Sequence, residues 1–451
     1  MRLPRTDRGR VVLVLLLAAA VTVFTATVPL LRDWFDLRVY YGTVDSWIHH
    51  GGRIYDYRVP GTTYGFTYPP FAAVAMLPMA LLDLHVAIAV ALLLNLAALA
   101  FVLRMLAGRA WRRYGWYGCA PAACALALFE PLRDTFSFGQ VNILLLALVL
   151  LDCRLLATGR GRWAGVGIGL AAAIKLTPAA FIGLLLVARR PRTAAVATAV
   201  AAAATALAAW VAPDASRFYW THAMWDTTRV GRLDYVSNQS LQGILARLDV
   251  SSRAVWAVVV LLVLGVWVAR TRRAVAAGDW TAAFALTGLT ACLVSPITWV
   301  HHLVWLLPSF AVLIRAGHLR IAGALYAMLC TSVVWLWFDD ASGVDGFLGS
   351  NAYTWITLGL LLRLPVGQSD SDGSTTLPRS TSDVAPAPIP AAPAIAHASA
   401  QPAPPSGATS ATTGTFAGPG LGLTRKASSD PTGSTRPAAS NPQSSSSPAS
   451  S

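Results

Sequence analysis

The stretch VVLVLLLAAAVTVFTATVPLL, residues 11–31, decides the fold class of this chain. It carries no charged side chain and is long enough to cross a bilayer, since a helix needs about 20 apolar residues to span about 30 Å of hydrocarbon. Basic residues precede it, and no convincing small-x-small cleavage site closes it, so we interpret it as an uncleaved first span rather than a signal peptide. The N-terminus is then predicted to be cytoplasmic.

The composition extends this interpretation to the whole chain. Of the 451 residues, 55% are hydrophobic and only 12% are charged, whereas soluble domains carry about 25% charged residues. The net charge of +14 comes from arginines that stand singly or in short groups between apolar runs. That arrangement is typical of topology markers and not of a nucleic-acid-binding face. We therefore predict an all-α polytopic membrane protein with no nucleic-acid partner.

Further apolar runs suggest about 10–12 transmembrane helices. A count of twelve leaves the arginine groups at 104–113 and 154–162 outside, against the positive-inside tendency. If the proline-bounded segment 68–82 and the broken segment 163–188 dip in and return, ten crossings remain and these groups fall inside. The candidate spans are 11–31, 68–82, 86–105, 114–130, 140–157, 163–188, 193–212, 254–270, 280–294, 300–316, 319–337 and 351–364.

Near residue 367 the composition changes to serine, proline, alanine, threonine and glycine. Such a segment cannot bury enough apolar surface to fold. We therefore divide the chain into a membrane domain, residues 1–366, and a disordered cytoplasmic tail, residues 367–451.

A carboxylate directly after the first span is the first candidate for chemistry. Aromatic neighbours around Asp36 would raise its pKa by desolvation, while Arg38 would lower it. A carboxylate held between these influences suits a general base. An interfacial loop with solvated acids is the alternative for this segment taken alone.

Polar side chains at membrane depth are further candidates, since they are costly in lipid. Residues 130–142 concentrate hydrogen-bonding groups between two apolar runs, which indicates a cavity lining. Lys175 lies in the middle of an apolar stretch. It either pairs with a buried acid such as Glu130 or contacts a phosphate or sugar.

Two outer loops complete the set. Residues 235–240 offer amide and hydroxyl groups that suit either a glycan or ordinary loop structure. His301 and His302 are adjacent at the outer end of a span. Neighbouring helical residues point about 100° apart, so the two imidazoles cannot readily share one metal. One of them donating to a phosphate is easier to build, and we predict no metal site.

Six motifs occur along the chain in a fixed order. They are DLRVY at 36–40, FTYPPF at 66–71, EPLRDTFSFGQVN at 130–142, KLTP at 175–178, SNQS at 237–240 and SPITWVHH at 295–302. Together they are similar to the actinobacterial polyprenol-phosphate-mannose-dependent α-1,2-mannosyltransferases that build phosphatidylinositol mannosides, lipomannan and lipoarabinomannan. The resemblance covers roughly residues 10–365.

This resemblance implies a GT-C type membrane fold and an inverting transfer at the outer face of the plasma membrane. The implied donor is polyprenyl phosphate-mannose, the acceptor a mannosylated lipid or glycan, and no cofactor is required. Asp36 matches the family's loop aspartate, and His301 and His302 match its outer histidine pair, which makes these three the catalytic candidates. The predicted substrate-binding residues are Tyr40, Tyr68, Glu130, Arg133, Asp134, Gln140, Asn142, Lys175, Asn238 and Gln239.

Other functions fit parts of the same pattern. A lipid-linked sugar transporter or flippase would also have many spans and a polar cavity, but transporters commonly carry internal repeats, and neither the Asp36 motif nor the His301 motif is repeated. A transferase that uses another polyprenyl phosphate sugar, such as arabinose, is a closer alternative. A structural subunit of an envelope complex is suggested mainly by the tail.

Overall fold

The computed structural model describes residues 6–27, 33–161 and 163–367. These residues form helices and no strand, with one isolated bridge between Arg58 and Gly65. The predicted all-α fold is therefore confirmed, while the predicted tail lies, except for Gly367, outside the described residues.

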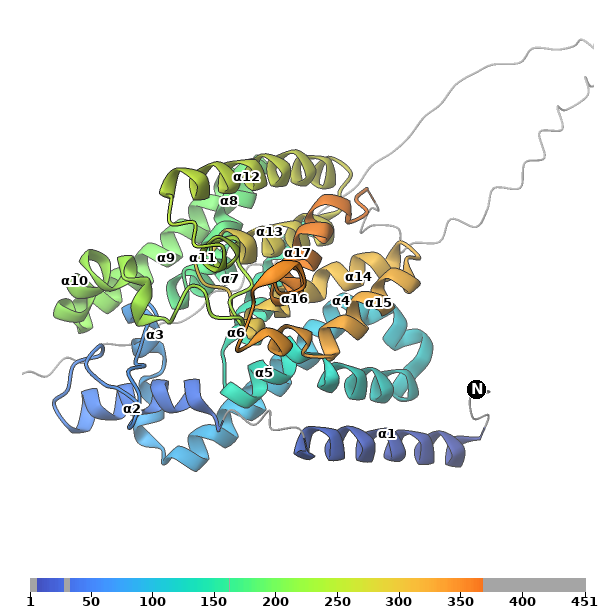
Figure 1. The fold of residues 1–451 in the computed structure, drawn as a ribbon, viewed down its shortest axis with the longest axis horizontal. Helices are drawn as coiled ribbons and strands as arrows, with labels where there is room; N and C mark the ends of the chain where they lie inside the picture. Colours follow the sequence, from blue (N-terminus) through green and yellow to red (C-terminus); the bar gives the residue numbers. More distant parts are fainter. Residues whose placement is uncertain (1–5, 28–32, 162, 368–451) are drawn as a thin grey trace, which may run out of the picture. The chain divides into compact units, whose positions relative to one another are not determined.

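The helices follow one another along the chain (Figure 1), and residues 50–69 and 230–240 form longer connections between them. The α-helices are α1 (Asp7–Thr27), α2 (Phe35–His49), α3 (Pro70–Ala75), α4 (Leu84–Leu128), α5 (Glu130–Phe138), α6 (Asn142–Ala157), α7 (Val166–Ile174), α8 (Ala180–Val187), α9 (Pro191–Val211), α10 (Pro213–Thr221), α11 (Leu241–Arg247), α12 (Arg253–Ala276), α13 (Trp280–Val294), α14 (Leu307–Arg315), α15 (Leu319–Cys330), α16 (Gly343–Ser350) and α17 (Ala352–Arg363). The 3₁₀ turns are η1 (Leu77–Leu81), η2 (Thr177–Ala179), η3 (Ala223–Trp225), η4 (Thr227–Arg229), η5 (Val300–Leu306) and η6 (Val333–Trp337).

Helix α13 is the centre of the domain. Its residues from Ala282 to Leu293 are all buried, and it packs against α12, α14, α17, α8 and η5. Small residues such as Ala282, Ala283 and Ala285 let these neighbours approach closely. Asp279 caps the helix by accepting from the Ala282 amide at 3.0 Å, which satisfies one of its free N–H groups.

Among the described residues, three helices are long and apolar enough to cross a membrane: Leu84–Gly108 within α4, α9 and α12. The pair α5 and α6, bent by 117°, is a fourth if it counts as one broken span. Only 22% of each long apolar stretch is buried, so most of its apolar surface faces outward, as hydrocarbon surroundings require. Six shorter apolar helices accompany them, and the number of crossings stays a prediction.

The segment from α7 to α8 enters the domain and turns back. A Cβ on Gly165, just before α7, would lie 2.5 Å from the Thr193 carbonyl oxygen at the start of α9. A Cβ on Gly169 would lie 2.5 Å from the Ala197 carbonyl, so α7 runs alongside α9. Because α8 ends just before α9 begins, both ends of the segment lie at the same end of α9. Lys175 lies at the turn between the two arms.

The short helices α3 and η1 lie along α2. Tyr68, ahead of α3, accepts from the Tyr40 hydroxyl on α2. After η1, Leu82 accepts from the Tyr41 hydroxyl on the same helix. Whether residues 68–82 dip into the membrane and return stays a prediction.

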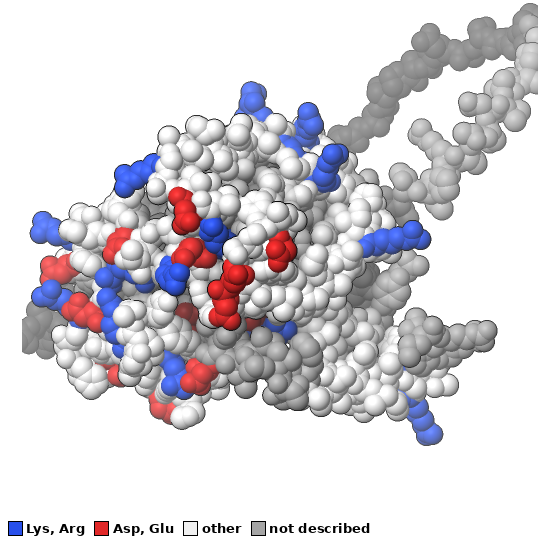
Figure 2. All heavy atoms as spheres, viewed as in Figure 1, with Lys and Arg blue, Asp and Glu red and all other residues white. Residues whose placement is uncertain are grey.

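Charge is distributed unevenly over the surface. In the view of Figure 2, the acidic side chains gather over the part of the domain that holds α2, α10 and α11 in Figure 1. The opposite edge shows basic side chains without acidic neighbours. The two ends of the helical domain thus differ in electrostatic character.

Candidate active site

Asp36 is held in place by a strained turn at the start of α2. Asp33 and Trp34 both have positive φ, 47° and 54°, a backbone conformation that non-glycine residues rarely adopt. The Trp34 amide donates to the Ser137 carbonyl at 3.0 Å. Gly139 lies opposite, where its φ is 70° and a Cβ would come within 2.6 Å of the Leu37 Cβ. The turn after α5 and the start of α2 therefore fit closely only with glycine at 139.

The Asp36 carboxylate accepts a hydrogen bond from Gln140. Gln140 Nε2 lies 2.7 Å from Asp36 Oδ2, and Gln140 stands in the sharp break between α5 and α6. Burial raises the pKa of Asp36 to about 6, although the Gln140 hydrogen bond and the charge of Lys175 oppose this. The expectation that Arg38 lowers this pKa is wrong, because its guanidinium pairs with Asp33 at 2.9 Å.

Two tyrosines extend the contact inward. The Tyr68 hydroxyl donates to Gln140 Oε1 at 2.8 Å, and the Tyr40 hydroxyl donates to the Tyr68 oxygen at 2.9 Å. The prolines after Tyr68 allow α3 to start at once, since proline suits the first helical position. Both tyrosines were predicted as substrate-binding residues, and the structure brings them together with Asp36.

Lys175 joins this group from the turn between α7 and α8. Its Nζ lies 3.1 Å from the Tyr68 hydroxyl and 2.9 Å from Asn142 Oδ1. Helix α7 ends at Lys175 in an extended conformation, and Pro178 follows one turn later. Among the described residues no ion pair joins Lys175 to Glu130, so the alternative of a structural pair with that acid is wrong.

The two histidines play different parts. His302 Nε2 lies 2.9 Å from Lys175 Nζ, and its Nδ1 accepts from the Trp299 amide at 3.2 Å. The ring of His301 packs edge-on against Phe138, with centroids 5.2 Å apart. The His301 carbonyl accepts from Thr135 and Asn142. His302 is thus the imidazole that belongs to the hydrogen-bonded group.

We call the residues joined in this way the Asp36 network. Side chains contact side chains throughout it, over elements distant in sequence, by hydrogen bonds except for the 2.9 Å contact between Lys175 Nζ and His302 Nε2. Its members are Asp36, Tyr40, Tyr68, Gln140, Asn142, Lys175 and His302.

Three predicted substrate-binding residues, Glu130, Arg133 and Asp134, lie in α5. Glu130 accepts from Trp335 Nε1 at 2.7 Å and from the Tyr353 hydroxyl. Arg133 donates to the Ser332 hydroxyl at 2.8 Å. Asp134 is buried, and its carbonyl accepts from Ser137 within α5. The Glu130 and Arg133 contacts tie α5 to the segment around η6 and to α17, and the predicted role of these residues toward a substrate stays a prediction.

Asn238 and Gln239 lie in a second polar region, which holds two loops together. Asn238 donates to the carbonyls of Leu233 and Pro296 and accepts from the Thr298 amide at 2.9 Å. Gln239 donates to the carbonyls of Val236 and Ser350, each at 2.7 Å. Both amide groups are fully buried. This geometry favours a structural role, and their predicted sugar contact stays a prediction.

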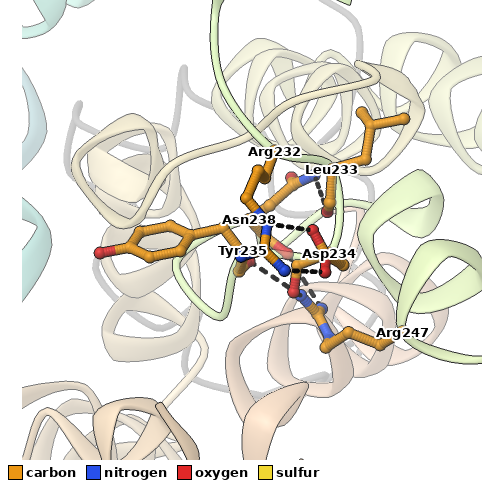
Figure 3. Close-up of polar contacts among 6 residues, drawn as sticks. All are labelled: Arg232, Leu233, Asp234, Tyr235, Asn238 and Arg247. Carbon is orange, nitrogen blue, oxygen red and sulfur yellow. Dashed lines mark hydrogen bonds and ion pairs between the residues drawn. The ribbon is translucent and has the colours of Figure 1, made fainter. Parts of the chain in front are cut away.

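Sequence reasoning missed two residues that organise the second region. The Trp299 backbone amide fixes the orientation of His302, and Arg247 donates to three loop carbonyls (Figure 3). Trp299 lies inside the quoted motif, but a backbone contact leaves no mark in a side-chain pattern. Arg247 could have been found as the one basic residue of a short apolar helix.

A carboxylate, a lysine and an imidazole on one network, inside a domain of apolar helices, define a helical membrane enzyme. The chain belongs to glycosyltransferase family 87, whose model matches residues 66–296. This membership agrees with the GT-C type fold expected from the resemblance.

Similar curated proteins come from mycobacteria. A Mycobacterium tuberculosis polyprenol-phosphate-mannose-dependent alpha-(1-2)-phosphatidylinositol mannoside mannosyltransferase is 35% identical over 67% of this chain and 72% of its own length. A Mycobacterium tuberculosis phosphatidylinositol pentamannoside mannosyltransferase with the same donor dependence is 31% identical over 74% of this chain and 79% of its own length. No solved structure matches the chain significantly.

Proposed function

We propose that this chain transfers mannose from polyprenyl phosphate-mannose to a mannose-terminated lipid or glycan and forms an α-1,2 linkage. The names of the mycobacterial relatives support the donor, the sugar and the linkage. The Asp36 network is the observation that carries the proposal, since it joins a possible base to two possible phosphate ligands.

The donor sugar is β-linked, so an α-linked product requires inversion in a single displacement. The acceptor hydroxyl oxygen attacks the anomeric carbon from the face opposite the phosphate. The bond from that carbon to the phosphate oxygen breaks, and polyprenyl phosphate leaves with the electron pair. Asp36 takes the hydroxyl proton, a role that suits a carboxylate whose pKa is near 6.

Lys175 and His302 are proposed to bind the departing phosphate. Because His302 Nδ1 accepts from the Trp299 amide, the hydrogen of a neutral imidazole lies on Nε2, the nitrogen that faces Lys175. A charged Lys175 can only donate. Two donors thus converge, and an anionic oxygen is a partner that satisfies both.

We further propose ten crossings within a membrane domain of residues 1–366, with the Asp36 network near the non-cytoplasmic side of the plasma membrane. This count takes 68–82 and 163–188 as segments that dip in and return. The turn between α7 and α8 supports it for the second segment, and the uneven charge of Figure 2 supports the orientation. Cysteine labelling in whole cells at 45, 230 and 400 tests it. Labelling at 45 and 230 only is expected, and labelling of 400 from outside would overturn the arrangement.

The donor is tested with purified protein in membranes. We expect mannose transfer from polyprenyl phosphate-mannose to a phosphatidylinositol mannoside, and no transfer from a nucleotide sugar unless it is first converted to the lipid form. Direct use of the nucleotide sugar would contradict the proposal. Faster transfer from polyprenyl phosphate-arabinose would keep the transferase class but replace the sugar. Movement of the lipid-linked sugar without transfer would identify a flippase.

A further inference from the structure

Arg247, at the end of α11, is the hub of the loop that precedes this helix. Its guanidinium donates to the carbonyls of Tyr235 and Asn238 at 3.0 Å each and to that of Asp234 at 3.4 Å. It also donates to Asn351 Oδ1. Figure 3 shows the loop carbonyls turned toward the guanidinium, while the Asp234 carboxylate is engaged by Arg232.

The packing of α11 makes this close approach possible. A Cβ on Gly243, one turn before Arg247, would lie 2.4 Å from the Asn238 carbonyl oxygen and 3.2 Å from Arg247 Nη2. The Ser240 hydroxyl caps the helix by accepting from the Gly243 amide at 3.0 Å. The helix, the guanidinium and the loop therefore fit together as one unit.

This unit is hydrogen-bonded to residues 296–298, which precede His301 and His302. Asn238 bonds to the Pro296 carbonyl and to the Thr298 amide. The Gln239 amide donates to the Thr298 carbonyl at 2.7 Å. The next residue, Trp299, donates its amide to His302 Nδ1. A path of hydrogen bonds and backbone links thus runs from Arg247 through Asn238 and Thr298 to Trp299 and the imidazole of the Asp36 network.

We propose that Arg247 is a positioning residue that sets the orientation and tautomer of His302 through Asn238 and the 296–299 segment. The inference rests on the proposed function of His302 as a phosphate ligand. Arg247 itself touches none of the Asp36 network. Its five N–H groups in a planar fork are what allow one side chain to hold several carbonyls, which a lysine ammonium cannot reproduce.

A double-mutant cycle tests the proposal. Arg247→Ala should lower kcat for mannosyl transfer about 10- to 100-fold, in line with a misplaced catalytic group, with a smaller change in KM. In a His302→Ala background the same change should alter kcat by less than a factor of about 2, because residues that act through one another are not additive. Equal losses in both backgrounds would overturn the proposal.

Arg270→Ala is the matched control. Arg270 also donates to two backbone carbonyls, those of Leu362 and Leu364, but on a different part of the domain. It should affect kcat little. If it lowers kcat as much as Arg247→Ala, the effect of Arg247 is general destabilisation and the proposal fails.

Two further measurements cover the case in which Arg247→Ala does not fold or the wild type shows no mannosyl transfer. Arg247→Lys keeps most of the packing but removes the planar fork, and Gly243→Ala pushes the Asn238 carbonyl away from the guanidinium, so both should give intermediate losses. Hydrogen exchange of the 297–302 backbone amides needs no activity, and in these variants it should become faster than in the wild type while exchange in α13 stays unchanged. Unchanged exchange in the variants would overturn the positioning role. If the wild type shows no mannosyl transfer but exchange is faster in the variants, only the proposed function is wrong.

Discussion

Gln140 and Gln239 are both buried glutamines that the sequence predicts to bind substrate, yet they lie in regions of different construction. Gln140 bonds to two side chains, those of Asp36 and Tyr68. Gln239 bonds mainly to backbone groups, those of Val236, Ser350 and Thr354. A side chain that bonds to ionisable side chains can change their pKa, whereas a side chain that bonds to backbone groups stabilises the fold. The comparison separates the Asp36 network from the loop region around Asn238.

The largest effect is expected at Asp36. Asp36→Asn keeps the size of the side chain but removes the base, so transfer should fall about 10²- to 10⁴-fold with donor binding largely intact. Transfer rates and donor binding in membranes measure this. Asp33→Asn and Asp45→Asn are the controls, since Asp33 pairs with Arg38 and Asp45 lies near His50. If either control loses transfer while Asp36→Asn keeps it, the assignment of the base is wrong.

The next effect distinguishes the two histidines. His302→Ala should lower transfer about 10²-fold, because one donor to the leaving phosphate is lost. His301→Ala should act mainly through lost packing against Phe138, so the thermal stability in detergent should fall more than the turnover per folded molecule. The reverse ranking of turnover would show that His301, and not His302, meets the phosphate.

The pH dependence should report the environment of Asp36. Its pKa is raised to about 6 by burial, and the base acts only when it is deprotonated. The rate of transfer should therefore fall about tenfold per pH unit well below pH 6. A profile that stays flat down to pH 4.5, measured with a donor that is stable over that range, would exclude Asp36 as the base.

Much of the fold and part of the site could be predicted from the sequence. Apolar runs indicate helices because hydrocarbon requires internal backbone hydrogen bonds, and the breaks at Gln140 and Lys175 follow from glycine and proline. The motif order identified the residues of the Asp36 network. The sequence could not reveal which residues pair in space. Arg38 bonds to Asp33 instead of lowering the pKa of Asp36. Arg247 lies 55 positions before His302, the histidine that it is proposed to position.

The smallest effect on turnover, and the sharpest test of the comparison, comes from the two glutamines. Gln239→Leu leaves the Ser350 and Val236 carbonyls without a donor, and each buried unpaired group costs about 1 to 3 kcal/mol. Thermal unfolding should therefore shift to lower temperature, while KM for the donor changes less than a factor of about 2 among folded molecules, since uniform binding is untouched.

Gln140→Leu should instead change the chemistry of transfer through Asp36. It removes the donor to Asp36 and the acceptor for Tyr68 without freeing a backbone group. Loss of the Gln140 hydrogen bond also removes an influence that lowers the pKa of Asp36, so the acid limb of the pH profile should move to higher pH. If Gln239→Leu instead raises KM for the donor strongly without a change in stability, Gln239 contacts the sugar as the sequence predicts. Hydrogen bonding to backbone groups would then not identify a purely structural residue.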